Sequence, residues 1–473
     1  MLRRPSLPRP SANQVDRLRR DLQRALGDAV VTDHDVLESF AGDESEQEPV
    51  LPDAVVRAAT KDQVIAAIAV ARDHGLPITP RGAGSGKSGG AVPVAGGVVL
   101  SCMGMASIKE IDTREHLAVV EPGVILGDLY EAVEAAGLFY PPDPNSWRVC
   151  ALGGNLAENA GGPRAFKYGV TRDWVLGLEV ITGDGTRLRT GRRTRKGVTG
   201  YDLTALMVGS EGTLGVITEA TLKLIRKPPQ IVTLLGLFAD VHAASRAVEA
   251  VVSAGLVPRC LELLDGACVA AMRGDGVAID ARAGALLVLE VDGEPEEAER
   301  QMEAVGGRAL DAGALDVLVA QDAAQRERLW QARRELSHTT RRMARHKISE
   351  DVVVPRRSMA DLVDAIRGIA ERTELRILNY GHAGDGNLHV NLLWDEPEEE
   401  PRVERALDEL FRTVVEMGGT LSGEHGIGSS KREFLHLEQD AALIETQRRI
   451  KAVFDPAGIL NPGKIFPTGH RAC

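Results

Sequence analysis

Residues 80–90 carry the sequence PRGAGSGKSGG, in which five of eleven residues are glycine. Two phosphate-binding motifs resemble parts of this run. A P-loop needs a glycine five residues before Gly86, but that position is Arg81. The run also contains the dinucleotide fingerprint G-x-G-x-x-G from residue 84, yet that loop must open a helix, and Ala91-Val92-Pro93 follows soon after instead. The spacing therefore disfavours both an NTPase and a nicotinamide-binding Rossmann domain.

The same run fits another use of glycine. It follows a short β-rich segment, and closely spaced glycines let backbone N–H groups converge on a diphosphate without interference from Cβ atoms. Three further segments are built from small residues and prolines over lengths that suit backbone packed against a large flat cofactor. They are PPDP at 141–144, GGNLAENAGG at 153–162 and GSEGTLG at 209–215.

The bulk composition indicates a globular enzyme of two or three domains. Among 473 residues there are 50 glycines and 23 prolines, which indicates many tight loops. The 56 basic and 68 acidic residues give a net charge of −12, which argues against a nucleic-acid partner, because phosphate binding needs a cationic face. The arginine-rich stretches 187–196 and 333–347 are expected to be mainly solvated surface.

The cysteines and the N-terminus bear on location. Five cysteines are odd in number, scattered and without a C-x-x-C pair, so neither a disulfide framework nor an iron–sulfur site is expected. No apolar run follows the N-terminal arginines, which disfavours a signal peptide, and no segment approaches the ~18 apolar residues of a membrane span. We therefore expect a cytoplasmic protein, with any membrane attachment peripheral.

Hydrophobic periodicity predicts an α+β fold in two halves. Thr60 to Gln63 predict a capping box for a helix that ends at Gly75, and its apolar stripe is Val64, Ile65, Ile68 and Ala69. A break is expected at 227–229, because the two prolines there can continue neither a central strand nor a helix. Before it we expect a helix at 125–136 and strands at 76–79, 98–101, 117–120 and 220–225.

Beyond the break, strands alternate with helices as in a second α/β sandwich. We expect strands at 231–237 and 286–291 and helices at 323–345 and 406–417. Acidic stretches at 294–299 and 395–400 are expected to be solvated connectors.

Histidines gather in two glycine-framed segments of the second half. The sequence GHAGDGNLHVN at 381–391 places two histidines around a tight turn that leads into a strand, where Asn387, His389 and Asn391 share one face. The segment 423–426, Gly-Glu-His-Gly, adds a carboxylate and a third imidazole in a loop that can approach a ligand closely. A His, His, Glu set with open positions suits zinc or another divalent first-row ion, so this pattern predicts metal chemistry.

These motifs, in this order, resemble the vanillyl-alcohol-oxidase/p-cresol-methylhydroxylase type of FAD-linked oxidases, and within it the D-lactate, glycolate and D-2-hydroxyglutarate dehydrogenase branch. The resemblance extends to the C-terminal run 454–464, FDPAGILNPGK. It implies a two-subdomain FAD-binding domain of the p-cresol-methylhydroxylase type and a C-terminal α/β cap, a ferredoxin-like substrate domain. We expect a lead-in at 1–47, the FAD-binding domain at 48–227 and the substrate and metal domain at 228–473.

The resemblance also implies which residues contact FAD. In the glycine loop, Gly82 to Gly86 would cradle the pyrophosphate. No histidine stands at residues 81–90, where some relatives attach the flavin, so we expect non-covalent FAD. The full implied set is Arg81, Gly82, Ala83, Gly84, Ser85, Gly86, Pro142, Ser146, Gly153, Gly154, Asn159, Gly161, Gly162, Ile217 and Asn461.

In the second half, the resemblance implies that His382, His389 and Glu424 hold the metal, zinc or manganese by expectation, and that His425 acts as base. For the substrate it implies Arg333 and Lys347, since an arginine can bind a carboxylate in bidentate fashion. Asn387, on the strand face that carries His389, is expected to contact the substrate as well.

The implied reaction is oxidation of a small anionic D-2-hydroxy acid to the 2-oxo acid. The residues leave open whether the acceptor is an electron-transfer flavoprotein, a cytochrome, a quinone or an iron–sulfur subunit, and whether the chain forms a homodimer. One alternative is the FAD subunit of a multi-subunit glycolate oxidase that passes electrons to an iron–sulfur partner. Another is a non-redox binding protein on an FAD-type scaffold, which the intact set of three histidines and a glutamate disfavours.

Overall fold

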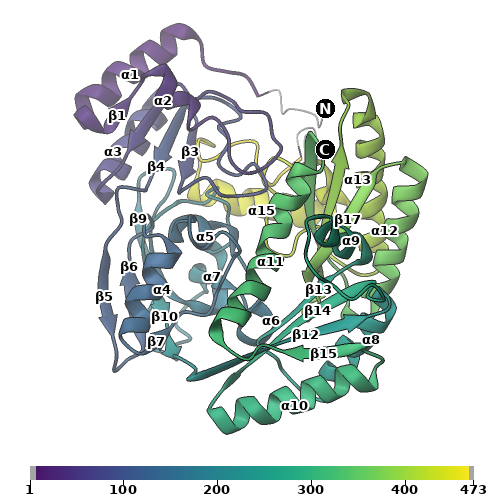
Figure 1. Cartoon of the computed structure of the whole chain (residues 1–473). Helices are drawn as coiled ribbons and strands as arrows, with labels where there is room; N and C mark the ends of the chain where they lie inside the picture. The colour runs from purple at the N-terminus through teal and green to yellow at the C-terminus, as the bar shows by residue number, and fades with distance from the viewer. Residues whose placement is uncertain (1–6, 468–473) are drawn as a thin grey trace.

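The computed structural model describes residues 7–467, which form three main sheets and the helices that cover them. Figure 1 shows the N-terminal half in purple and blue beside the C-terminal half in green, with α15 (Ala441–Phe454) in yellow between them. Lys451 on α15 donates to the carbonyl oxygen of Thr213, so the C-terminal segment returns to the first half. No helix among residues 7–467 is long and apolar enough to cross a membrane.

The first sheet presents the glycine loop. Its order is β1-β2-β4-β3, with β2, β4 and β3 parallel, and the loop at 82–97 leaves the end of β3 without forming a helix, as predicted. The strands are β1 (Val30–Val31), β2 (Ala54–Arg57), β3 (Ile78–Arg81) and β4 (Val98–Ser101).

The helix expected beside this sheet is α3 (Lys61–His74), and Gly75 ends it in a left-handed conformation. The Thr60 side chain accepts from the backbone N–H of Gln63, but the Gln63 side chain accepts from the backbone N–H of Ala59 and not of Thr60, so the reciprocal box is shifted by one residue. The fully buried stripe is Val64, Ala67, Ile68 and Ala71, which confirms Val64 and Ile68, whereas Ile65 and Ala69 are only partly buried. The helix packs against α1 (Ala12–Leu26) and β4.

The lead-in is part of this first unit. Val30 pairs with Val56 across β1 and β2, and Leu18 and Leu22 of α1 are fully buried in the same core as α3. A short helix, α2 (His34–Glu38), completes it. The burial of α1 explains why it is folded, although the lead-in is polar in composition.

The second sheet is antiparallel, in the order β5-β6-β10-β8-β9, and helices α4 and α5 pack on it. Its strands are β5 (Ile108–Asp112), β6 (Leu117–Val120), β8 (Val175–Ile181), β9 (Arg187–Gly191) and β10 (Val216–Lys223). Around it lie α4 (Leu126–Ala135), α5 (Leu152–Glu158), α6 (Ala165–Tyr168), α7 (Leu203–Met207) and the pair β7 (Leu138–Phe139) and β11 (Ile225–Arg226).

The third sheet begins after the two prolines. It has seven antiparallel strands in the order β15-β12-β14-β13-β17-β18-β16. They are β12 (Gln230–Phe238), β13 (Cys260–Leu264), β14 (Ala285–Gly293), β15 (Asp316–Val319), β16 (His346–Val353), β17 (Arg376–His382) and β18 (Asn387–Trp394).

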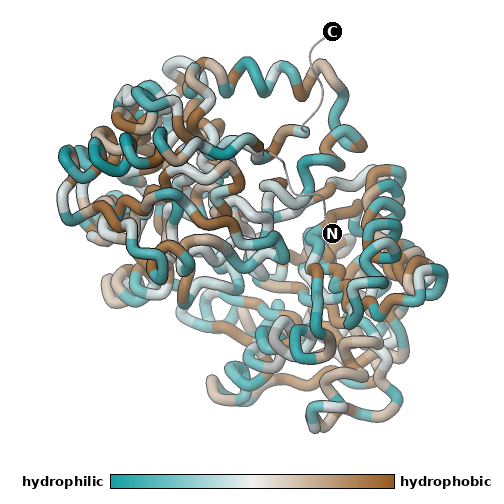
Figure 2. The backbone as a smooth tube through the Cα atoms, turned by 90° about the horizontal axis from the view of Figure 1, so that it is seen from above, coloured by the Kyte–Doolittle hydropathy of each residue, from teal (hydrophilic) through white to brown (hydrophobic). Residues whose placement is uncertain are grey.

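Helices cover both faces of this sheet, as the predicted sandwich requires. One face packs against α8 (Val241–Ser253), α10 (Pro295–Asp311), α12 (Met359–Thr373) and α13 (Glu400–Glu416). The other packs against α9 (Gly266–Gly274) and α11 (Ala323–Arg342). Hydrophilic and hydrophobic residues are interspersed along the helices (Figure 2), so each outer helix can bury one side and expose the other.

The two acidic stretches are not connectors. Residues 294–299 start α10, and residues 395–400 lead through a 3-10 turn into α13. Both helices place a proline in the first turn together with glutamates, which interact favourably with the positive end of the helix dipole. The prediction of connectors was wrong because acidic residues suit the first turn of a helix as well as they suit solvent.

Candidate active site

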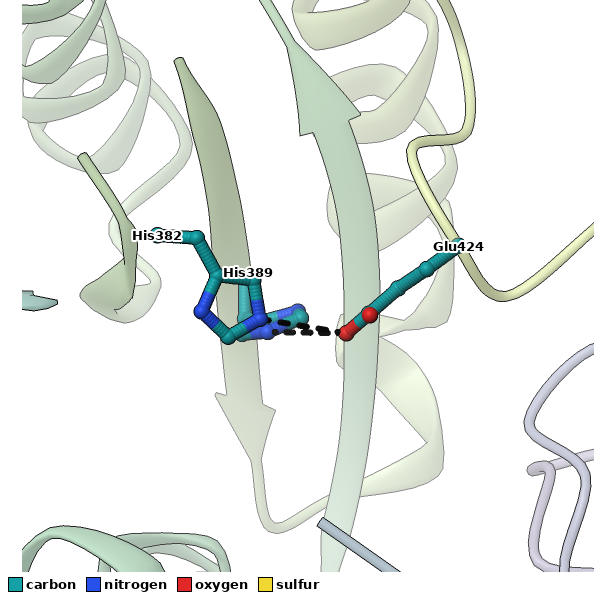
Figure 3. A group of neighbouring side chains, drawn as sticks. All are labelled: His382, His389 and Glu424. Atoms are coloured by element: carbon teal, nitrogen blue, oxygen red, sulfur yellow. Dashed lines mark hydrogen bonds and ion pairs between the residues drawn. The ribbon is translucent and has the colours of Figure 1, made fainter. Parts of the chain in front are cut away.

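Two histidines and a glutamate converge on the face of the third sheet that α11 covers (Figure 3). His382 ends β17 and His389 lies on β18, and the hairpin between these strands brings the imidazoles to a centroid distance of 5.1 Å. The Oε1 atom of Glu424 lies 3.3 Å from His382 Nε2 and 3.5 Å from His389 Nε2. One ligand atom from each residue lies within 4.8 Å of the others, which is close enough to hold one metal ion.

The two imidazoles have different electrostatic surroundings. Burial lowers the pKa of His389, and the neighbouring His382 and His425 lower it further, so its pKa is well below the ordinary value. Burial also lowers the pKa of His382, but Glu262 and Glu424 outweigh burial and raise it well above the ordinary value. His389 Nδ1 is buried without a hydrogen-bond partner among the described residues, and the nearest carboxylate oxygen is 3.8 Å away on Asp351.

Asp351, on β16, fixes the loop that carries Glu424. Its Oδ2 atom accepts from the backbone N–H groups of Gly423, Glu424 and His425, at 2.8, 2.7 and 2.9 Å. Burial favours a raised pKa for this carboxyl, but the neighbouring His425 and Lys431, together with the hydrogen bond from the Glu424 N–H, hold the pKa well below its usual range. A charged carboxylate that binds three successive N–H groups sets the backbone of Glu424 and His425 together.

His425 lies against the metal candidates without being one of them. Its ring stacks on that of His389, with centroids 5.2 Å apart and planes at 13°. Burial lowers its pKa, against the opposing effect of Asp351 and Glu424, so the neutral imidazole is favoured. Glu424 points toward His382 and His389, whereas His425 stands beside them, as expected if the two neighbours have different roles.

Arg333 is buried on the inner side of α11. Its Nε and Nη2 atoms donate to Glu262 Oε2 at 2.9 and 2.7 Å, and its guanidinium lies 4.5 Å from the ring centroid of Tyr380. The Nη1 end of the guanidinium has no hydrogen bond to the described residues and can still donate to a carboxylate. The arginine expected on a predicted helix is therefore in the site and not on the solvated face.

Lys347, on β16, also lies under α11. Its Nζ atom donates to Thr340 Oγ1 at 2.7 Å and to the carbonyl oxygen of Ser337 at 3.1 Å. Burial lowers the pKa of Lys347 to about 8.

Asn387 has two hydrogen bonds within the protein, and its expected contact with the substrate stays a prediction. Its amide nitrogen donates to Asp351 Oδ1 at 2.6 Å and to the carbonyl oxygen of Val352 at 3.1 Å. Both amide hydrogens are thus used within the protein, and Asn387 supports the carboxylate that sets the Glu424 loop.

The glycine segments of the first half meet one another and the metal candidates. A Cβ atom on Gly82 would lie 3.5 Å from the backbone nitrogen of Gly154, so the loop after β3 touches α5. The segment 209–215 also reaches α5, where the Gly209 N–H donates to the Leu156 carbonyl oxygen at 3.0 Å. A Cβ on Gly161 would lie 2.8 Å from Glu424 Oε2, so the segment that follows α5 lies against the loop that carries Glu424.

The C-terminal segments close this region. The Glu211 carboxylate accepts from the backbone N–H groups of Ile427 and Gly428, at 2.8 and 2.6 Å. Asn461 donates to the carbonyl oxygens of Gly90 and Glu211, and its Oδ1 is buried without a partner among the described residues. The sequence-predicted loops of both halves therefore share one region.

The other residues expected to contact the flavin lie at the following places in the fold. The backbone of Pro142 accepts from Tyr130, and the C-cap residue Asn159 is left-handed, with φ 54°. Ile217 lies on β10 and is buried, and Gly153 lies in the first turn of α5. Arg81 is buried, but its guanidinium turns toward the lead-in and donates to the Gly42 carbonyl oxygen at 2.6 Å. The remaining expected residues, Ala83, Gly84, Ser85, Gly86, Ser146 and Gly162, lie in loops.

Two buried carboxylates of the site, Glu262 and Asp351, do not follow from the sequence motifs. Glu262 stands in the apolar strand Cys-Leu-Glu-Leu-Leu, and a lone charge in a buried strand is a signal that points to a paired partner. Asp351 offers no such signal, because it follows Glu350 in a stretch that also suits an exposed strand.

Known families match both halves of the chain. The family described as "FAD binding domain" matches residues 52–191, and the family "FAD linked oxidases, C-terminal domain" matches residues 227–465. Among solved structures, p-cresol methylhydroxylase has a TM-score of 0.82 at 19% identity, covering 97% of this chain and 98% of that one. This likeness shows the p-cresol-methylhydroxylase type of fold that the sequence predicted.

Curated relatives match over most of their length. The glycolate oxidase subunit GlcD of Bacillus subtilis is 42% identical over 91% of this chain and 93% of its own. The D-lactate dehydrogenase of Anaerostipes hadrus is 35% identical, with 88% and 89% covered, and the D-2-hydroxyglutarate dehydrogenase of Stutzerimonas stutzeri is 34% identical, with 92% and 96% covered. The chain belongs to the FAD-linked oxidases and is an FAD-dependent oxidoreductase.

Proposed function

We propose that this enzyme oxidises a small D-2-hydroxy acid, of the glycolate, D-lactate or D-2-hydroxyglutarate class, to the 2-oxo acid. The names of its relatives support this substrate class. The observation that carries the proposal is the contact between the two halves. The Glu424 carboxylate, which faces His382 and His389, lies directly against Gly161 of the flavin-binding half. A substrate held there would have flavin on one side and a base, His425, on the other.

The donor set fits a divalent metal. Two imidazoles and a carboxylate with ligand atoms within 4.8 Å suit zinc or manganese and leave positions open for a substrate. His382, His389 and Glu424 would hold the ion. The glycine segments fit FAD, because a Cβ added at Gly154 would meet open space, and the buried Asn461 Oδ1 has no hydrogen-bond partner among the described residues. We propose non-covalent binding of FAD by the residues named from the sequence.

FAD, when bound by the first half, would supply the acceptor for the hydride of the substrate Cα, and a divalent ion held by His382, His389 and Glu424 would supply a Lewis acid for the hydroxyl, whose pKa is roughly 15 in water. His425 takes the hydroxyl proton, since its lowered pKa keeps the imidazole neutral. The Nη1 end of Arg333 and the ammonium of Lys347 bind the substrate carboxylate. Asn387 acts indirectly, through Asp351.

Anaerobic mixing tests this function. The flavin absorbance of the holoenzyme should bleach with at least one D-2-hydroxy acid from a panel of glycolate, D-lactate and D-2-hydroxyglutarate, and should persist with the L enantiomers. A dye acceptor in a second assay measures turnover. If none of the acids reduces the flavin while dithionite does, the substrate class is wrong.

Lys347 should make substrate binding sensitive to alkaline pH. Its pKa of about 8 means that the ammonium is charged below that pH and neutral above it. The KM for an anionic substrate should therefore rise by up to about tenfold between about pH 7 and about pH 9. In Lys347→Met, KM should be high at both values and independent of pH. A flat KM in the unmodified enzyme would remove Lys347 from the substrate site.

A reduced flavin would need a separate electron acceptor, and the GlcD relative, named as a subunit, favours a protein partner. One alternative is that the chain is the FAD subunit of such a complex, with an iron–sulfur partner. The other is a stand-alone dehydrogenase that uses an electron-transfer flavoprotein, a cytochrome or a quinone. Co-purification separates the two. We also propose a cytoplasmic location, peripheral at most to the membrane, since Cys102, Cys150, Cys260 and Cys268 are buried free thiols.

A further inference from the structure

Glu262 is a fully buried carboxylate at the centre of the third sheet. It lies in the middle of β13, where Cys260, Glu262 and Leu264 point to the face covered by α9 and α11. A buried carboxylate is costly unless charged or hydrogen-bonded partners compensate it. The strand is otherwise apolar, so the partners of Glu262 indicate why a charge is kept there.

Its two oxygen atoms have different partners from different elements. Oε1 lies in hydrogen-bond contact with Nδ1 of His382, on β17. Oε2 accepts from Nε and Nη2 of Arg333, on α11, at 2.9 and 2.7 Å. One side chain thus holds an imidazole of the metal cluster with one oxygen and the cation expected to bind the substrate with the other.

The contact with His382 sets which ring nitrogen is free. A carboxylate only accepts hydrogen bonds, so the Nδ1 atom of His382 carries a hydrogen, and Nε2 is the ring nitrogen that faces Glu424 and would be left to bind a metal. Partners of this kind orient metal-binding histidines, and their removal weakens metal affinity by roughly 10–100-fold.

We infer that Glu262 is a positioning residue that orients His382 for metal binding and Arg333 for the substrate carboxylate at the same time, so the two sites are coupled through one side chain. This inference rests on the proposed function, in that it takes His382 as a metal ligand. The Glu262 carboxylate bridges His382 and Arg333, so the loss of either partner changes how the carboxylate holds the other.

Glu262→Gln tests the bridge, because an amide has only one accepting oxygen. The charged guanidinium should keep that oxygen, since hydrogen bonds from a cation are the stronger ones. The amide NH₂ then faces His382 Nδ1, and the affinity of the FAD-loaded, metal-free protein for Zn²⁺ should fall by roughly 10–100-fold. Zinc titration with a competing chelator measures this without reference to activity.

The double variant Glu262→Gln/Arg333→Met supplies the sharper result. Once the guanidinium is gone, the amide oxygen can turn to His382 Nδ1, so zinc affinity should recover to within a few-fold of the unmodified protein. Substrate KM should remain raised, since Arg333 is missing. If the second substitution leaves zinc affinity as weak as in Glu262→Gln alone, Glu262 does not bridge the two residues.

Glu290→Gln is the matched control. Glu290 is a buried glutamate on the neighbouring strand β14. It pairs with Arg259 and accepts from Trp330 of α11, and among the described residues it has no hydrogen bond or ion pair to a histidine. The Glu290→Gln variant should lose thermal stability, whereas its affinity for zinc should stay within a few-fold of that of the unmodified protein. Equal loss of zinc affinity in both single variants would overturn the inference and leave the proposed function intact. Failure of the unmodified protein to bind Zn²⁺ would instead overturn the metal centre itself, and the inference with it.

Discussion

His425→Asn should slow reduction of the flavin by at least ~100-fold, as expected for the loss of a general base. The imidazole of His425 stacks on His389, and burial lowers its pKa, so it is a neutral base beside the site where the substrate hydroxyl would lie. Asparagine is polar and of similar reach, but it cannot take up a proton. The measurement is anaerobic stopped-flow reduction, followed at the flavin absorbance.

The variant should keep its fold, FAD and metal, because the backbone N–H of residue 425 still donates to Asp351 and Glu424 is unchanged. Substrate affinity should change much less than the rate. His436→Asn is a matched control, since His436 is exposed and lies outside the cluster. Rapid flavin reduction in a metal-replete His425→Asn enzyme would show that another group takes the proton.

Much of the fold could be predicted because its signals are local. Thr60 and Gly75 mark the ends of α3, and Pro228 and Pro229 precede the third sheet. The spacing alone distinguishes the glycine loop from a P-loop and a Rossmann loop, and residues 91–97, which follow it directly, form no helix. The acidic starts of α10 and α13 were missed, because composition does not separate a first helical turn from a solvated loop.

The site could be predicted only where a motif carries it. His382 and His389 share a hairpin and Glu424 adjoins His425, so short segments reveal all four. The residues that hold them come from elsewhere: Glu262 lies 120 positions before His382, and Asp351 lies 73 positions before Glu424. Such pairs depend on the strand order of the sheet, which periodicity does not give. For the same reason the hydrogen bond from the Asn387 amide to Asp351 does not follow from the sequence.

Removal of the metal should reduce turnover more than any single substitution named above, while FAD stays bound. The hydroxyl of a 2-hydroxy acid has a pKa of roughly 15, far above that of histidine, and a divalent ion can lower it by several units, so its loss should slow flavin reduction by ~1000-fold or more. The expected flavin contacts, from Gly82 to Gly86 and from Gly153 to Gly162, come from the first half of the chain, whereas the metal candidates found among residues 7–467 all lie in the second half.

The experiment compares dialysis against a strong chelator with dialysis against buffer, measuring metal content, bound flavin and the rate of anaerobic reduction in each sample. Adding back Zn²⁺ or Mn²⁺ should restore the rate, and the ion that restores more of it is the one that supports the reaction. Glu424→Gln should lose metal first and activity as a consequence, because its Oε1 faces both imidazoles, so excess metal should rescue it in part. The same excess should not rescue His425→Asn, whose metal ligands are intact. Exhaustively demetallated enzyme that keeps its full rate would exclude a metal from the reaction and leave His382, His389 and Glu424 a purely structural cluster.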